Sequence, residues 1–122
     1  MGNSYRDLLV WQKAKALAVS VYRATENFPK SEVFGLTAQL RRAAISVPSN
    51  IAEGQGRGSK KEFAQFLCIA RGSLLEVMTQ AEIAAELGVG HAQSMHKLQA
   101  DCEEVLFLLN RLLRSMESKP RN

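Results

Sequence analysis

The residues best suited to binding chemistry lie in one short segment, residues 46–61 (SVPSNIAEGQGRGSKK), where three glycines in five positions precede a basic pair. A loop of this kind could cradle a phosphate, contact nucleic acid, or only connect two helices. GQGRGSKK lacks the GxxxxGKS or GxxxxGKT spacing of a P-loop, and Ser59 replaces the last glycine of GxGxxG. No strand is predicted before the segment, so both nucleotide-binding motifs are rejected. Two interpretations of the segment stay open. It could bind an anion through Arg57, Lys60 and Lys61 at a helix N-terminus, or it could be only a solvated turn.

Catalytic groups are few in the rest of the chain. His91 and His96 are spaced by five and do not share a helix face well, and no HExxH, CxxC or Glu-x-x-His motif is present. Ser73 has neither a strand–turn–helix elbow nor a base, and we interpret it as a small helix-packing residue. Glu103 and Glu104 are assigned to a solvated helix face. We therefore predict no catalytic residue, no metal and no cofactor, and we do not expect an enzyme.

The composition is that of one ordinary globular domain. The 122 residues are 46% hydrophobic and 23% charged. No apolar run approaches the ~18–20 residues that a membrane helix needs. The N-terminal MGNSYR shows no signal-peptide pattern, and Arg6 stands where a myristoylation motif has serine or threonine. We expect a cytoplasmic protein with no membrane partner.

The two cysteines, Cys68 and Cys102, both fall on apolar faces of predicted helices. A hairpin turning near residues 88–90 separates them by ~12 Å along the axis, at ~1.5 Å per residue. A disulfide needs Cα atoms within ~7 Å. We therefore expect two buried, reduced thiols.

Helical periodicity runs through the whole chain, and no segment alternates with period two for long enough to predict a strand. Four amphipathic helices with short connections predict an all-α fold, an antiparallel up-and-down four-helix bundle that forms a single domain over residues 1–122. The predicted helices span about residues 8–27, 32–54, 60–88 and 91–116.

Local signals set the predicted ends of these helices. Asp7 is a plausible N-cap for the first helix, and Pro29 ends it. Pro48 removes a hydrogen bond inside the second helix, so we expect one helix with a kink there. The third helix begins with SKKE, a capping box between Ser59 and Glu62.

Some apolar residues do not fit the inward stripe of their helix when projected at ~100° per residue. Six such residues on neighbouring helices would form a patch that favours a partner, so they are candidates for an oligomer interface. The alternative is that they are half-buried at helix edges. They are Ile45, Ile69, Leu75, Ile83, Phe107 and Leu108.

The net charge of +4 is concentrated in the middle of the chain. Between residues 41 and 71 the only acidic residues are Glu53 and Glu62. A polar stripe that contains Arg42, Ser46, Ser49 and Glu53 could be a solvent face, a subunit contact or an RNA contact. The basic residues of the segment are the candidate nucleic-acid-binding residues, namely Arg41, Arg42, Arg57, Lys60, Lys61 and Arg71.

Several motifs together resemble a known family. DLLVWQKA (7–14), QLRRAAISVPSNIAEGQGR (39–57), EFAQFL (62–67) and ARGSLLE (70–76) are similar to the four-helix-bundle proteins also called 23S ribosomal RNA intervening-sequence proteins. The resemblance covers about residues 5 to 90. It implies a bundle that assembles into a ring-like homopentamer, with members encoded in insertions of the large-subunit ribosomal RNA gene or standing alone in bacterial genomes. Related retroelement accessory proteins form a basic pentameric barrel that engages a reverse transcriptase and nucleic acid.

Two hypotheses about function follow. The first is a non-catalytic homo-oligomer, a pentamer by resemblance, that binds ribosomal RNA or other nucleic acid by neutralising phosphates. Five copies of the +4 chain would carry about +20. The second is a protein-interaction scaffold for a polymerase, such as a reverse transcriptase-like protein, or for a ribosome-associated factor. The Arg41–Arg57 block could serve either binding or assembly.

Overall fold

The computed structural model describes residues 4–117, which form helices and no strand. The four α-helices are α1 (Leu9–Thr25), α2 (Leu36–Gly56), α3 (Lys60–Glu86) and α4 (Ala92–Ser115). Two short 3-10 helices, η1 (Tyr5–Asp7) and η2 (Lys30–Glu32), precede α1 and α2. The predicted all-α class is confirmed.

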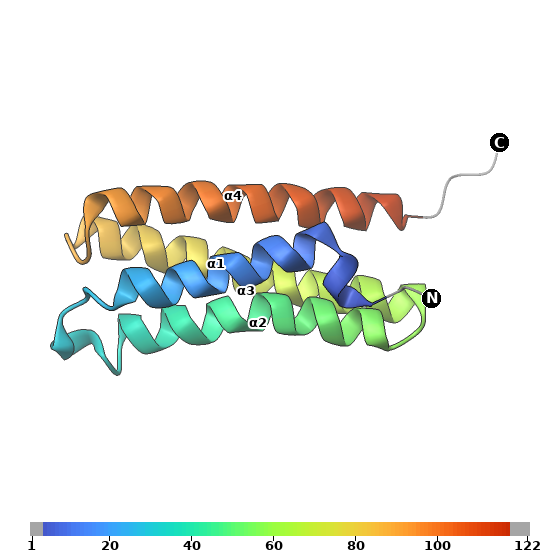
Figure 1. The fold of residues 1–122 in the computed structure, drawn as a ribbon, viewed down its shortest axis with the longest axis horizontal. Coiled ribbons are helices and arrows are strands. Elements are labelled where there is room, and N and C mark those ends of the chain that lie inside the picture. Colours follow the sequence, from blue (N-terminus) through green and yellow to red (C-terminus); the bar gives the residue numbers. More distant parts are fainter. Residues whose placement is uncertain (1–3, 118–122) are drawn as a thin grey trace.

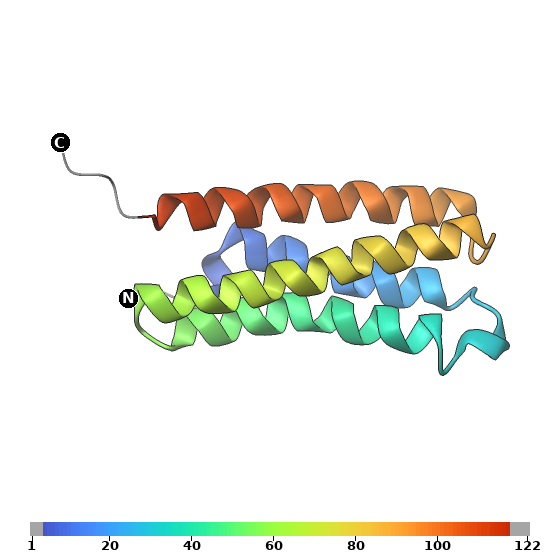
Figure 2. The same ribbon diagram turned by 180° about the vertical axis from the view of Figure 1, so that it is seen from behind.

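The helices run up and down as an antiparallel bundle (Figures 1 and 2). Each helix packs against the next helix in the chain, and α1 also packs against α4, whereas the diagonal pairs α1–α3 and α2–α4 do not pack. The start of α1, the α2–α3 turn and the end of α4 therefore lie at one end of the bundle (Figure 1). The α3–α4 turn and the α1–α2 connection lie at the other.

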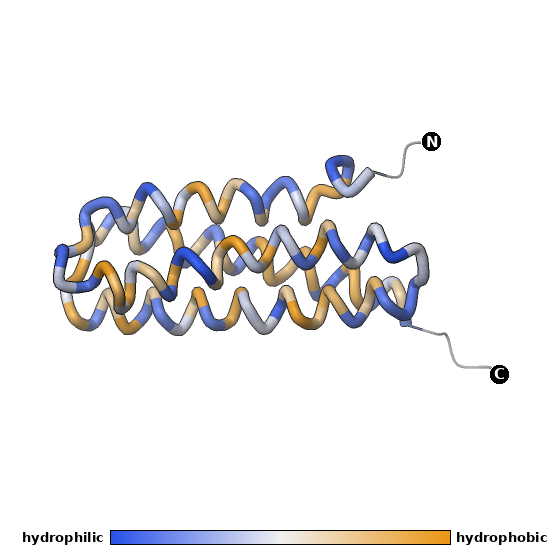
Figure 3. Tube along the Cα trace, turned by 90° about the horizontal axis from the view of Figure 1, so that it is seen from below, coloured by the Kyte–Doolittle hydropathy of each residue, from blue (hydrophilic) through white to orange (hydrophobic). Residues whose placement is uncertain are grey.

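The core is built from the inward stripe of each helix. Apolar residues recur about once per helical turn along every helix, with polar residues between them (Figure 3), as the 3.6-residue period of an amphipathic helix requires. Burying a leucine-sized side chain stabilises the fold by roughly 1.5–3 kcal/mol. The fully buried leucine and isoleucine side chains, each at most 2% exposed, come from all four helices: Leu17, Leu40, Ile51, Leu67, Leu74, Leu98 and Leu109.

Two predicted helix starts are corrected by the structure. Asp7 does not cap α1, because it belongs to η1, and the N-cap position of α1 is occupied by Leu8 without a side-chain hydrogen bond. The second helix begins at Leu36 rather than near residue 32. Glu32 lies in η2 instead, and its carboxylate accepts a hydrogen bond from the Leu36 amide at 3.2 Å. This bond satisfies one of the amides that a helix start leaves without an intrahelical partner.

The predicted start of α3 is correct. The Ser59 hydroxyl accepts from the Glu62 amide at 3.1 Å and donates to the Glu62 carboxylate at 3.1 Å. A serine cap of this kind stabilises a helix by about 1 kcal/mol relative to alanine. The cap fixes where the chain re-enters a helix after the turn.

Pro48 lies inside the continuous helix α2, so the interpretation as one helix is correct, and the kink stays a prediction. Next to it, the Asn50 side-chain amide donates to the Ser46 carbonyl and to the Ser46 hydroxyl, both at 2.8 Å. These bonds fix the Ser46 and Asn50 side chains on the polar side of α2.

The glycines after Pro48 do not form the loop that their spacing suggested. Helix α2 continues through Gly54 and ends at Gly56, and of the three glycines only Gly58 has a positive φ, +86°. A Cβ on Gly54 would lie 2.5 Å from the Cβ of Phe66 and 3.2 Å from the Phe63 ring. Gly54 therefore allows α2 and α3 to approach closely, and α2 ends two residues later than predicted.

Both cysteines are free, as predicted, but only Cys102 is buried. Cys68 is exposed, so its predicted burial is wrong; it faces away from the inward stripe that contains Leu67 and Ala70. Burial, together with the smaller effect of the charges of Asp101 and Glu103, raises the pKa of the Cys102 thiol from 9.0 to about 12.

This pKa predicts a stability that falls in alkali. Above about pH 9 the unfolded chain loses the Cys102 proton while the folded chain retains it up to about pH 12, so the unfolded state binds fewer protons and stability decreases. The difference in free energy of unfolding between the wild type and Cys102→Ala should narrow between about pH 8 and about pH 10. Urea unfolding of both proteins at the two pH values measures this difference. A difference in free energy of unfolding that does not change with pH would contradict the raised pKa of Cys102.

Candidate nucleic-acid and subunit interfaces

The six candidate basic residues lie in three separate places. Arg41 and Arg42 lie in the first half of α2, whereas Arg57, Lys60 and Lys61 lie at the α2–α3 turn. At ~1.5 Å per residue, Arg41 is about 24 Å from the turn along the helix axis. The sixth residue, Arg71, lies within α3. The structure therefore does not bring the six residues into one patch.

Arg41 is held by contacts within the protomer. Its guanidinium donates to the Thr25 hydroxyl at 2.8 Å and to the Tyr22 carbonyl at 3.2 Å. It also lies 4.5 Å from the centre of the Tyr22 ring. Thr25 is buried and its hydroxyl donates to the Val21 carbonyl at 2.8 Å. Arg41 thus joins the end of α1 to α2.

Arg71 has a similar position between α3 and α4. Its guanidinium donates to the Asn110 side-chain oxygen at 2.8 Å and approaches the Cys68 sulfur at 3.9 Å. It is partly buried, whereas Arg42 is exposed. Of these three arginines, only Arg42 has its side chain placed for contact with a large partner.

Arg41→Ala should therefore affect stability more than binding. Loss of hydrogen bonds from a charged donor and of the contact with the Tyr22 ring predicts a decrease of about 1–3 kcal/mol in the free energy of unfolding. Urea unfolding followed by circular dichroism measures this decrease. Unchanged stability together with a large loss of nucleic-acid binding would contradict the structural role.

Arg57, Lys60 and Lys61 are exposed at the start of α3. Arg57 pairs with Glu53 at 3.0 Å and lies 5.0 Å from the Phe66 ring centre. Lys60 and Lys61 form no ion pair within residues 4–117. The amides of the first turn of α3 add partial positive charge at the same place. These groups can contact a phosphate without rearranging the bundle.

The fold adds basic residues that the local charge count did not include. Arg6 in η1 and Arg114 in the last turn of α4 lie at the bundle end that holds the α2–α3 turn (Figure 1). Arg111 precedes Arg114 by one turn. We call residues 4–8, 53–62 and 110–117 together the basic end. Its acidic residues are Asp7, Glu53, Glu62 and Glu117, against the basic residues Arg6, Arg57, Lys60, Lys61, Arg111 and Arg114.

The opposite end has the opposite charge balance. It comprises residues 23–35 and 82–93 and is called the acidic end. Arg23 and Lys30 are its only lysine or arginine residues, whereas four glutamates lie in these ranges. Those glutamates are Glu26, Glu32, Glu82 and Glu86. Charge is thus sorted along the bundle axis, which the net value of +4 does not reveal.

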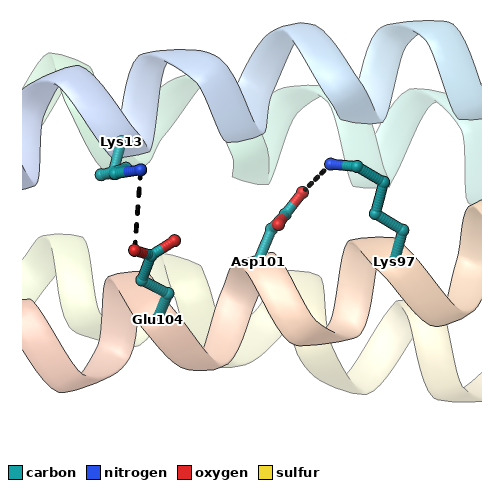
Figure 4. Close-up of polar contacts among 4 residues, drawn as sticks. All are labelled: Lys13, Lys97, Asp101 and Glu104. Carbon is teal, nitrogen blue, oxygen red and sulfur yellow. Dashed lines mark hydrogen bonds and ion pairs between the residues drawn. The ribbon is translucent and has the colours of Figure 1, made fainter.

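Along the α1–α4 side, basic and acidic groups pair locally (Figure 4). Lys13 lies 3.6 Å from Glu104 across the two helices, and Lys97 lies 2.8 Å from Asp101 within α4. Exposed pairs of this kind contribute only about 0–1 kcal/mol each. They neutralise this side, so it is a poorer surface for phosphate than the basic end.

The predicted interface residues are exposed, with one exception. Exposure is 44–57% for the five that the structure places on the surface. Leu108 is 8% exposed and belongs to the core, so its assignment to an interface is wrong. It faces the start of α1, where Leu8 and Val10 line the same hollow. The five exposed residues are Ile45, Ile69, Leu75, Ile83 and Phe107.

Exposed apolar residues on α1 were missed by the sequence analysis. Val19 is 44% and Tyr22 38% exposed, and with Ile45 they line a hollow of about 490 Å³ between α1 and α2. Buried Ala18 and Pro48 also line it. We call this hollow the α1–α2 groove. Val19 lies outside the α1 stripe, and that signal was available from the sequence.

The predicted polar stripe on α2 partly faces α3. The hydroxyls of Ser46 and Ser73 lie 2.8 Å apart, and the Gln80 amide donates to the Gln39 oxygen at 3.2 Å. Ser73 is thus a polar packing residue between helices. Ser49 is exposed, so that part of the stripe faces outward.

The fold and the axial charge pattern define a small up-and-down four-helix-bundle protein. The model of the 23S rRNA-intervening sequence protein family matches residues 6–111, and the chain belongs to that family. It is also similar to the crystal structure of a protein of unknown function from the S23 ribosomal protein family of Bacteroides thetaiotaomicron, with a TM-score of 0.78 and 22% identity over 87% of this chain and 99% of that chain. At this identity the likeness shows the fold alone. No curated protein matches the chain.

No helix in the described part of the chain is long and apolar enough to cross a membrane. Nor do residues 4–117 contain a group of three or more metal-ligating side chains.

Proposed function

We propose that this protein is a non-catalytic, homo-oligomeric helical bundle that binds structured RNA or DNA through its basic end. The observation that carries the proposal is the axial sorting of charge, with Arg57 exposed in the α2–α3 turn and Lys60 and Lys61 exposed at the N-terminus of α3. The family's name connects it with 23S ribosomal RNA, so fragments of that RNA are the first ligands to test.

Assembly strengthens this function. A ring of parallel copies, five by the family resemblance, would place every basic end on the same face and multiply the contacts with one nucleic acid. Phosphate contacts from several protomers add to the affinity without reading sequence. The Phe66 ring near the turn is covered by Arg57, so recognition of backbone and shape is the form proposed.

The proposed absence of catalysis has its own support. The Ser73 hydroxyl is bonded to the hydroxyl of Ser46, which is not a general base at neutral pH. His91 and His96 are both exposed at the other end of α4 from the basic end.

The test is the binding of labelled 23S ribosomal RNA fragments at several salt concentrations. The logarithm of the binding constant should fall linearly with the logarithm of salt concentration, with a slope of about −0.7 to −0.9 per phosphate contact. Absence of salt-sensitive binding to RNA and to DNA would contradict the proposal.

A second candidate function is a protein-interaction scaffold for a polymerase or a ribosome-associated factor. The exposed apolar residues Val19, Tyr22 and Ile45 favour it, because an exposed apolar cluster indicates a contact surface. A scaffold protein should have little intrinsic affinity for nucleic acid, so RNA binding measured at several salt concentrations distinguishes the two candidate functions.

A further inference from the structure

Helix α3 contains a glycine that the packing of the protomer does not require. Gly72 lies in the middle of α3, and a Cβ added there would meet nothing within 4 Å. Glycine inside a helix is about 1 kcal/mol less favourable than alanine. At Gly54, by contrast, a Cβ would collide with Phe66, which explains that glycine within the protomer. The missing side chain of Gly72 leaves open space on the outer surface of α3.

The residues around this space are mostly apolar. On a helix, the positions that surround a residue are three and four places before and after it. For Gly72 these positions hold Cys68, Ile69, Leu75 and Glu76, and all four are exposed. Four helix residues arranged in this way form a hole that accepts a side chain of another helix. We call these five residues the Gly72 hole.

The α1–α2 groove has matching properties. It is apolar along Val19, Tyr22 and Ile45, and the charged residues that line it are Lys15, Arg23 and Glu26. Because the groove is concave and Gly72 has no side chain, the backbone of α3 from another copy can lie close to α1 and α2.

The charges of the two surfaces are complementary. Helix α1 contains Lys13, Lys15 and Arg23 and no acidic residue. From Gly72 to its end, α3 contains Glu76, Glu82 and Glu86 and no basic residue. A parallel contact between two copies of this half of α3 would oppose like charges, and so would a contact between two copies of α1. Contact of α3 with the α1–α2 groove opposes unlike charges, which favours this pairing.

We propose that α3 of one copy, at its Gly72 hole, docks into the α1–α2 groove of a second copy. The inference rests on the homo-oligomer in the proposed function and specifies its contact surfaces. Val19, Tyr22 and Ile45 of the groove and the residues of the hole are all exposed in the protomer, so each copy presents both surfaces outward. Such a contact is heterologous, joining different surfaces of identical chains, and it forms a ring when the rotation between copies closes.

The substitution Gly72→Gln separates assembly from folding. Glutamine favours a helix more than glycine does, and the space is open, so the free energy of unfolding of the protomer should not decrease. The side chain fills the hole, however, so the mass in solution should fall to that of a single 13.5 kDa chain. Light scattering and urea unfolding provide the two readouts. The control is Gly56→Gln, where a Cβ also meets nothing within 4 Å, and it should retain the wild-type mass.

The exposed thiol gives an independent readout. Cys68 borders the hole, whereas Cys102 is buried and does not compete for a thiol reagent. In the wild-type assembly, Cys68 should react at least about tenfold more slowly than in Gly72→Gln, because the second copy covers it. Equal reaction rates would overturn the docking.

Charge reversal tests the pairing of the surfaces. Glu76→Lys should dissociate the assembly, and adding Arg23→Glu to the same chain should restore part of it. An assembly that persists in both Gly72→Gln and Glu76→Lys overturns this contact and leaves the proposed oligomer intact. A wild-type protein that is monomeric overturns the contact and the oligomer together, so the two failures are distinguishable.

Discussion

Replacing Arg57, Lys60 and Lys61 together by alanine is expected to abolish most of the salt-dependent binding of RNA. Each phosphate contact contributes about 0.7–0.9 to the slope of log K against log salt, so the slope should become shallower by about 2 for every protomer in contact. The largest loss of affinity should occur at low salt, where phosphate contacts contribute most. The effect on folding should be small, because the ion pair of Arg57 with Glu53 is exposed, its contact with the Phe66 ring is at the surface, and the two lysines form no ion pair within residues 4–117.

A matched variant controls for the loss of net charge. Lys13→Ala, Lys30→Ala and Lys97→Ala together also remove three positive charges, but none of these residues lies at the basic end. This control should change the slope much less than the first variant. If both variants lose the same affinity, binding depends on total charge and the basic end is not the site.

Gly54→Ala should destabilise the bundle although alanine favours helices. The added Cβ would lie 2.5 Å from the Phe66 Cβ, an atom fixed directly to the backbone of α3. A rotamer change cannot relieve that overlap, so the two helices must separate. Overpacking of this kind costs about 1–3 kcal/mol, which exceeds the gain of up to about 1 kcal/mol from helix propensity.

The measurement is urea unfolding of Gly54→Ala beside Gly56→Ala. Gly56 is two residues further along α2, and a Cβ there meets nothing within 4 Å. Gly56→Ala should be at least as stable as the wild type. Equal stabilities for the two variants would show that α2 and α3 do not approach as closely as the structure indicates.

The four helices could be predicted because their apolar residues repeat with the period of a helix. Helix starts were less predictable, because the same local residues can begin a helix or form a short 3-10 turn before it. Glu32 was expected inside the second helix, but it lies in η2 and accepts a hydrogen bond from the first amide of α2. Gly54 belongs to a run of three glycines that normally indicates a loop. Its actual role depends on Phe66, a residue on the facing helix that sequence spacing alone does not place.

The candidate site was only partly predictable for a related reason. A count of charge along the sequence grouped Arg41 and Arg71 with the turn residues, although both are bonded within the protomer. The same count missed Arg6 and Arg114, which reach the basic end only because the bundle folds up and down. Leu108 was expected outside the core because its partners at the start of α1 cannot be placed from the sequence, and Cys68 was expected to be buried although it lies outside the inward stripe of α3.

Hydrogen exchange of the wild-type protein, with and without a structured fragment of 23S ribosomal RNA, tests most directly where nucleic acid binds. We predict slower exchange in peptides that cover residues 54–62, and no change in those that cover residues 82–93 at the acidic end. Protection confined to the acidic end, or no protection anywhere at saturating RNA, would contradict binding through the basic end.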